Sequence, residues 1–128
     1  MLLSLTTQTR EPGIVIVSIT GRIALGVEKG QIEDAVVGAL KDGVRRIVID
    51  LAHVSYIDSA GVGIIAFCFG KASQMGAQFS VAATDARVTD VFRITRLDQV
   101  VTFFPDVDSA CGALGAARPS AAAGVPTP

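Results

Sequence analysis

Residues 44–63 read VRRIVIDLAHVSYIDSAGVG, and this stretch decides how the rest of the chain is arranged. The second half of Val44–Leu51 is apolar on both faces, which is typical of a strand covered on both sides. Residues 52–58 predict a loop. Ser59 then opens an apolar segment of helical length that runs to Met75, and Gly76 ends it. We therefore expect a central strand, a loop and a helix in direct succession.

The flanking segments alternate between strand and helix patterns. The turn signal Glu11–Gly13 separates the first two strands, which predicts a hairpin. Strands are expected at 2–8, 14–19, 78–83 and 100–104, and helices at 30–41, 86–94 and from Pro105 to about Leu114. This alternation predicts an α/β fold in which a mixed, mostly parallel β-sheet carries packed α-helices.

Composition limits the classes of protein to which the chain can belong. Its 128 residues, 50% apolar and 18% charged, suit one folded domain, expected over residues 1–115. Residues 116–128 are rich in Ala and Pro and predict a disordered tail. A net charge of -1 argues against direct nucleic-acid binding and a polybasic membrane tether.

Other features argue against a metal and a membrane span. Two cysteines without CxxC spacing and a single histidine, His53, exclude a finger-type zinc site. No cofactor is expected. The longest apolar run, Ile64–Phe69, is six residues and too short to span a membrane. We expect a cytoplasmic protein in which Cys68 and Cys111 are reduced and buried as small hydrophobic residues.

The segment Ile49–Gly63 resembles the signature of STAS domains, the family of anti-sigma factor antagonists and of domains attached to sulphate transporters. In that pattern a strand ends in Asp-Leu, and an apolar residue, Asp-Ser, a small residue and Gly open a helix. The matching residues are Asp50, Leu51, Ile57, Asp58, Ser59, Ala60 and Gly61. TGRIAL at 20–25 is similar to the loop after the family's second strand. The resemblance implies a single STAS-like domain.

The resemblance also implies a function, that of a binding module and not of an enzyme. In anti-sigma factor antagonists the Ser of the Asp-Ser pair, here Ser59, is the phosphoacceptor of a partner serine kinase that is also the anti-sigma factor. The unphosphorylated protein sequesters this kinase and releases the sigma factor, and a PP2C-type phosphatase reverses the phosphorylation. The partner-binding residues expected on this basis are Arg22, Ala24, Ile57, Asp58, Ala60, Gly61 and Val62. Ala24 departs from the acidic residue that many members carry there.

The residues around Ser59 suggest how such a switch works. Ser59 stands where a loop becomes a helix, so the helix dipole tolerates an anion there. A phosphate adds a charge of about -1.5 to -2 beside Asp58, which a partner that excludes water would have to bury. Alternatively, Ser59 is only an N-cap. Asp58 either positions the Ser59 hydroxyl or favours the helix dipole.

Two further features are open to two interpretations each, and a third concerns the apolar side chains of the helix. Asp50 ends a strand, where it serves either a ligand or a local hydrogen bond. Gly61 and Gly63 permit either close approach of a partner or tight helix–sheet packing. Most of the run Ile64–Phe69 is expected in the core, and at least one of its side chains, on the first two turns near Val62, is expected to stay partly exposed as an anchor for a partner.

Two other functions compete with the regulatory one. A small hydrolase with Ser59 as its nucleophile would depend on His53 as the only histidine base, and the chain lacks a GxSxG elbow. The second is a STAS subunit of a lipid-transport complex or a sensory assembly. It shares the fold and differs only in its partner.

Overall fold

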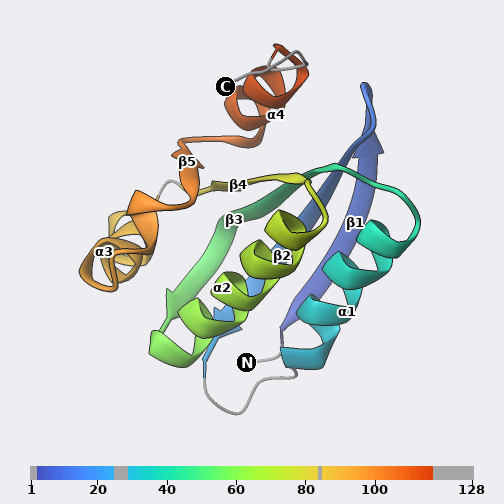
Figure 1. Ribbon diagram of the computed structural model, residues 1–128. Coiled ribbons are helices and arrows are strands. Elements are labelled where there is room, and N and C mark those ends of the chain that lie inside the picture. The colour runs from blue at the N-terminus through green and yellow to red at the C-terminus, as the bar shows by residue number, and fades with distance from the viewer. Residues whose placement is uncertain (1–2, 25–28, 84, 117–128) are drawn as a thin grey trace.

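The computed structural model describes residues 3–24, 29–83 and 85–116 (Figure 1). The strands are β1 (Ser4–Arg10), β2 (Ile14–Ile23), β3 (Arg46–Ile57), β4 (Gln78–Ala82) and β5 (Thr102–Phe104). The helices are α1 (Lys29–Lys41), α2 (Ser59–Gln74), α3 (Ala86–Ile94) and α4 (Val107–Ala116), with a 3-10 turn, η1, at Leu97–Gln99. The predicted alternation of strands and helices is confirmed.

The strands form one five-stranded sheet in the order β1-β2-β3-β4-β5. β1 and β2 are an antiparallel hairpin, and its turn contains Gly13 at a φ of 70°. The other neighbouring strands are parallel. β3 lies in the middle, because Arg46–Asp50 pairs with β2 on one side and with β4 on the other. The predicted mixed, mostly parallel sheet is therefore confirmed.

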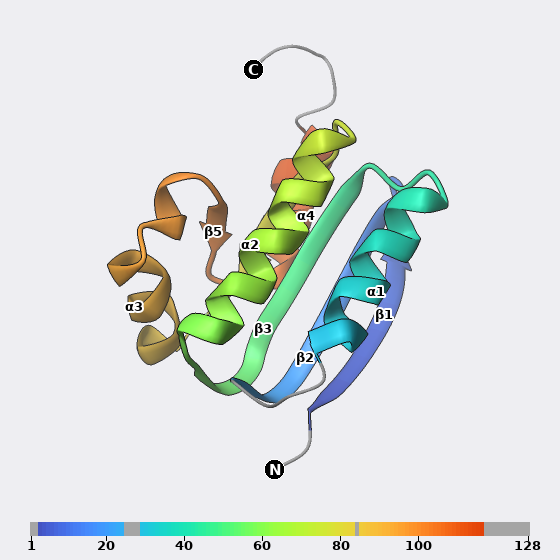
Figure 2. The same cartoon turned by 60° about the horizontal axis from the view of Figure 1, so that its bottom comes forward.

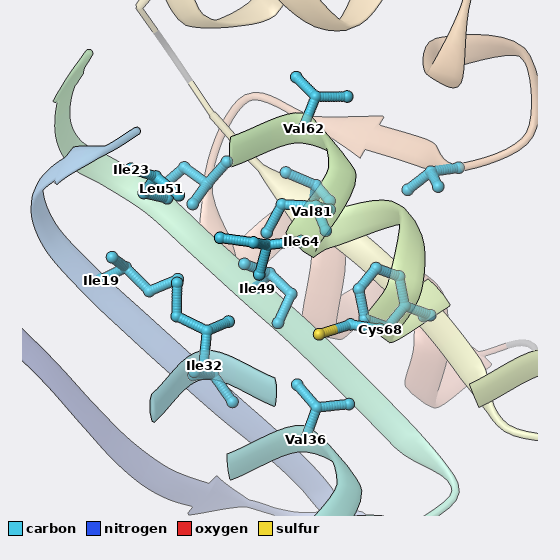
Figure 3. Close-up of a cluster of buried hydrophobic side chains, with 14 of the residues drawn as sticks. Ile19, Ile23, Ile32, Val36, Ile49, Leu51, Val62, Ile64, Cys68 and Val81 are labelled. Carbon is cyan, nitrogen blue, oxygen red and sulfur yellow. The ribbon is translucent and has the colours of Figure 1, made fainter. Parts of the chain in front are cut away.

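Helices cover both faces of the sheet. Alternate strand residues point to opposite faces, so Ile49 joins the larger core cluster with α1, α2 and α3, whereas its neighbour Val48 packs with α4. Figure 2 shows α1 and α2 side by side over one face of the sheet. Figure 3 shows Ile32 of α1 and Ile64 of α2 meeting Ile19 and Ile49 of the sheet.

Both cysteines are buried and free, as the sequence predicts. Cys68 lies in α2 within the larger cluster, and burial raises the pKa of its thiol to about 12. Cys111 lies in α4 in the smaller cluster, and burial raises the pKa of its thiol as well. Both side chains act as small hydrophobic residues.

The predicted loop at 52–58 is wrong, because β3 continues to Ile57. Ser18 pairs with Asp50, and the next pair is Thr20 with His53. Between these two pairs β2 advances by two residues and β3 by three, so β3 contains a bulge. A second such bulge follows Gly21. The bulges space the buried residues of this half of β3 three apart, at Leu51, Val54 and Ile57. A period of three hides the alternation by which a strand is recognised.

Other boundaries differ by a few residues. β1 ends at Arg10 and β5 begins at Thr102. Thr20–Ile23, expected in a loop, extends β2 alongside the bulged half of β3. The predicted tail beyond Ala116 lies outside the described residues. In the described part of the chain no helix is long and apolar enough to cross a membrane.

The sheet order predicts which backbone amides exchange slowly with solvent. Val48 and Ile49 lie between two paired strands, so we expect their amides to exchange only on global unfolding. Thr6–Gln8 of the edge strand β1 have a partner strand on one side only. Alternate amides there should exchange faster. Hydrogen exchange followed by NMR checks this, and fast exchange at Val48 and Ile49 would contradict the central position of β3.

Candidate functional site

The N-terminus of α2 is capped by Asp58. Its backbone is extended, and its carboxylate Oδ1 accepts a hydrogen bond from the Gly61 backbone N–H at 2.9 Å. Its carbonyl oxygen accepts from the Val62 N–H at 2.9 Å, which closes the first helical turn. Asp58 is therefore the N-cap, and its carboxylate favours the helix dipole, as one of the two interpretations held. The alternative that Ser59 is the N-cap is wrong.

Ser59 is the first residue of α2 and is exposed. Within the described residues its hydroxyl makes no hydrogen bond that holds it to the fold. The first backbone N–H groups of a helix have no partner inside the helix, and the dipole places about half a positive charge there. The helix start therefore stabilises a negatively charged group on Ser59. Because Asp58 makes the cap, the Ser59 side chain is not needed for it.

A close contact between Gly61 and β2 fixes the start of α2. A Cβ atom at Gly61 would lie 2.2 Å from the Ile23 carbonyl oxygen and 2.7 Å from Cγ1 of Ile57. The same Ile23 oxygen accepts a hydrogen bond from the Asp58 N–H at 3.3 Å. Glycine is required at position 61 because any side chain would push the helix off the end of β2.

Gly63 has a different environment, although it lies only two residues further on. A Cβ atom there would meet nothing within 4 Å, and the residue is exposed. The two interpretations left open by the sequence therefore apply to different glycines. Gly61 serves tight helix–sheet packing, whereas packing within the described part of the chain does not require glycine at position 63.

The remaining expected site residues fall into two groups. Ile57 and Val62 are 3% and 5% exposed and belong to the core beneath the helix start. An exposed apolar side chain is present on α2, as expected, but it does not lie next to Val62. Ala60 and Ala24 are half-buried. The exposed apolar side chain of α2 is Phe67, at 43%.

Arg22 and Tyr56 form an exposed pair on neighbouring strands. They are register partners at the ends of β2 and β3, and the guanidinium carbon of Arg22 lies 4.1 Å from the centroid of the Tyr56 ring. Tyr56 comes three residues before Ser59. The sequence analysis missed Tyr56 and placed the exposed apolar side chain of α2 about one turn before Phe67. The available signals were the position of Phe67 two turns after Ser59 and the place of Tyr56 next to the Asp-Ser pair.

Asp50 serves a local structural role. Its Oδ1 accepts a hydrogen bond from the Ala52 backbone N–H at 3.0 Å, and its Oδ2 accepts from the Ser18 hydroxyl at 3.1 Å. The carboxylate thus satisfies backbone at the first bulge of β3, which confirms the hydrogen-bond interpretation. Over the described ranges, no three His, Cys, Asp or Glu side chains gather as metal ligands would.

Comparison with known proteins finds a matching family model and related sequences. A family model described as the STAS domain matches residues 6–110. A curated anti-sigma factor antagonist homologue from Thermotoga neapolitana is 31% identical over 71 residues, which is 56% of this chain. The chain spans 63% of the length of that relative.

Solved structures share the fold. An anti-sigma factor antagonist from Mycobacterium paratuberculosis superimposes with a TM-score of 0.78 at 26% identity, over 87% of this chain and 92% of that one. The Bacillus cell fate determinant SpoIIAA in its phosphorylated form superimposes with a TM-score of 0.68 at 15% identity, over 87% and 99% of the two chains. At that identity, the second similarity concerns the fold alone.

The two glycines predict opposite effects on stability. Gly61→Ala should lower the free energy of unfolding by about 1–3 kcal/mol, because the new methyl group clashes with the backbone of β2. Gly63→Ala should raise it by about 1 kcal/mol, because the site is open and alanine favours helix. Denaturant titration of the two variants checks both signs. A Gly61→Ala variant as stable as the wild type would contradict the tight contact.

Proposed function

Because the chain belongs to the STAS domain family, whose model covers residues 6–110, we propose that it is an anti-sigma factor antagonist switched by phosphorylation of Ser59. In its unphosphorylated form it binds an anti-sigma factor that is also a serine kinase, and the sigma factor is released. The kinase transfers the γ-phosphoryl group of ATP to the Ser59 hydroxyl, ADP leaves, and the product no longer binds. A PP2C-type phosphatase hydrolyses the phosphate ester and restores binding.

One observation carries this proposal: Ser59 is an exposed residue on the first turn of a helix whose cap is made by its neighbour Asp58. Asp58 supplies the capping bond to Gly61, so Ser59 is available for modification without loss of that bond. The division of labour between the two residues favours a modification site.

The fixed backbone beneath Ser59 supports a switch that acts at the interface and leaves the fold intact. The Gly61 contact and the Ile23 hydrogen bond hold the helix start on β2. A phosphate there is solvated in the free protein and is close to the positive end of the helix dipole. A partner that covers Ser59 has to desolvate this dianion next to the Asp58 carboxylate. Binding is therefore lost while the domain stays folded.

Asp58 acts as a positioning residue in this proposal. Its cap fixes the direction in which the first turn leaves β3, and so fixes where the Ser59 hydroxyl is presented. The Arg22–Tyr56 pair at the adjoining strand ends adds an exposed cation and ring to the same end of the molecule. Arginine and tyrosine are enriched where partners bind.

Binding should depend on the charge at position 59 and not on its hydroxyl. Ser59→Ala should bind the purified kinase about as tightly as the wild type and accept no phosphate. The phosphorylated protein should bind at least about 100-fold more weakly, because a buried unpaired charge costs several kcal/mol. Ser59→Asp, with less charge than a phosphate, should show a smaller loss. Isothermal titration of the four forms, after mass mapping of the phosphate, measures this.

The matched control is Ser73→Ala, because Ser73 is an exposed serine near the other end of the same helix. It should be phosphorylated and bound like the wild type. Equal affinity of the phosphorylated and unphosphorylated proteins would contradict the switch. Phosphate found on Ser55 and not on Ser59 would contradict the site.

A further inference from the structure

The outer face of α2 lacks charge over its first three turns. From Ser59 to Gly70 the helix contains no charged or amide side chain, and Lys71 is the first. The positions that are not fully buried in this stretch are small or apolar: Ser59, Ala60, Gly63, Ala66, Phe67, Phe69 and Gly70. A helix with one face on a sheet normally carries polar residues on the other. A partner that binds this face of α2 can therefore bury apolar surface.

The geometry of the helix joins this face to Ser59. Ser59, Gly63 and Phe67 follow one another at intervals of four residues and therefore lie along one side of α2. Each interval advances by about 6 Å, which places Phe67 about 12 Å from Ser59 along the axis. All three residues are exposed. The face is therefore one continuous strip with Ser59 at one end.

Gly63 makes the middle of this strip a shallow notch. Apart from its chain neighbours and the backbone of α2 itself, no described atom lies within 4 Å of the position that its Cβ would take. The notch has the Ser59 side chain on one side and the Phe67 ring on the other. A glycine in a helix costs about 1 kcal/mol relative to alanine, and packing within the described residues does not account for it here.

Phe67 closes the other end of the strip. Its side chain is 43% exposed, and the Lys71 ammonium lies 5.5 Å from the ring centroid. Lys71 forms no ion pair with a described acidic residue. A half-exposed ring beside an ammonium without a described acidic partner suits a partner that covers the ring with an apolar group and presents a carboxylate to the ammonium.

A partner that binds over Ser59 with an interface of ordinary size also covers this strip. A stable interface buries about 800 Å² on each side, which corresponds to a disc of roughly 16 Å radius. A kinase that brings its active site to the Ser59 hydroxyl and stays bound therefore reaches a residue about 12 Å away. The anti-sigma factor kinase is the partner that has to approach this end of α2.

We propose that the kinase docks along the strip Ser59–Gly63–Phe67, with an apolar side chain in the notch at Gly63 and a carboxylate beside Lys71. This inference rests on the proposed function and adds to it a second contact region beyond the phosphorylated residue. The strip gives the kinase affinity for the unphosphorylated form. Ser59 then supplies the switch at one end.

Filling the notch tests the proposal without disturbing the fold. Gly63→Gln places a side chain in open space and replaces a helical glycine, so the thermal midpoint should rise by about 3–5 °C. The same variant should bind the kinase at least about tenfold more weakly, because the side chain occupies the notch. Gly38→Gln is the matched control, since Gly38 is an exposed glycine of α1 with equally open space. It should raise the midpoint and leave the affinity unchanged.

Phe67→Ala is the second variant and removes the ring while keeping the helix. It should weaken binding about tenfold or more with a normal circular dichroism spectrum. Titration of the wild type and the three variants with the purified kinase gives the affinities. Gly63→Gln and Phe67→Ala affinities within twofold of the wild type would overturn this inference. If phosphorylation of Ser59 still abolished binding in that case, the proposed function would stand alone.

Two other outcomes also overturn it. If Gly63→Gln splits a dimer seen by sedimentation and leaves kinase affinity unchanged, the strip is an interface between copies of this chain. If the wild type neither binds the kinase nor is phosphorylated on Ser59, the proposed function fails and this inference fails with it.

Discussion

The close approach of Gly61 to the end of β2 is the constraint on which the site depends. With no side chain at position 61, the first turn of α2 rests on the Ile23 carbonyl, which also accepts the Asp58 N–H. Asp58 caps the helix from the same place. These contacts fix the backbone on both sides of Ser59 and leave its side chain outside. A modification there changes the surface and meets a backbone that has no room to move inward.

The second half of β3 positions the start of α2 next to the end of β2. Two bulges bend the pairing of β3 with β2, and Asp50 satisfies the backbone N–H of Ala52 at the first of them. Without the extension to Ile57, the helix would start from a loop free of the sheet. Because β3 ends at Ile57 and Asp58 caps the helix directly after it, Ser59 is held at the end of the sheet.

The sequence predicted the regular parts of this structure well. The run Val44–Leu51 identified the central strand, and the helical period located α1, α2 and α3. It failed at residues 52–57, because the bulges space the buried side chains of β3 three apart and remove the alternation. The sequence also could not separate Gly61 from Gly63, since the difference lies in what the fold places against each. The exposure of Phe67 depends on helix orientation, which a run of apolar residues leaves undetermined.

The central claim is that phosphate on Ser59 changes the surface and leaves the fold unchanged. A comparison of backbone amide NMR spectra of the unphosphorylated and phosphorylated protein tests it most directly. We expect shift changes confined to residues 57–63 and the adjoining end of β2, with hydrogen exchange in β3 and the rest of α2 unaltered. Shift changes throughout the sheet, or loss of exchange protection along α2, would contradict the account and make the switch one of folding.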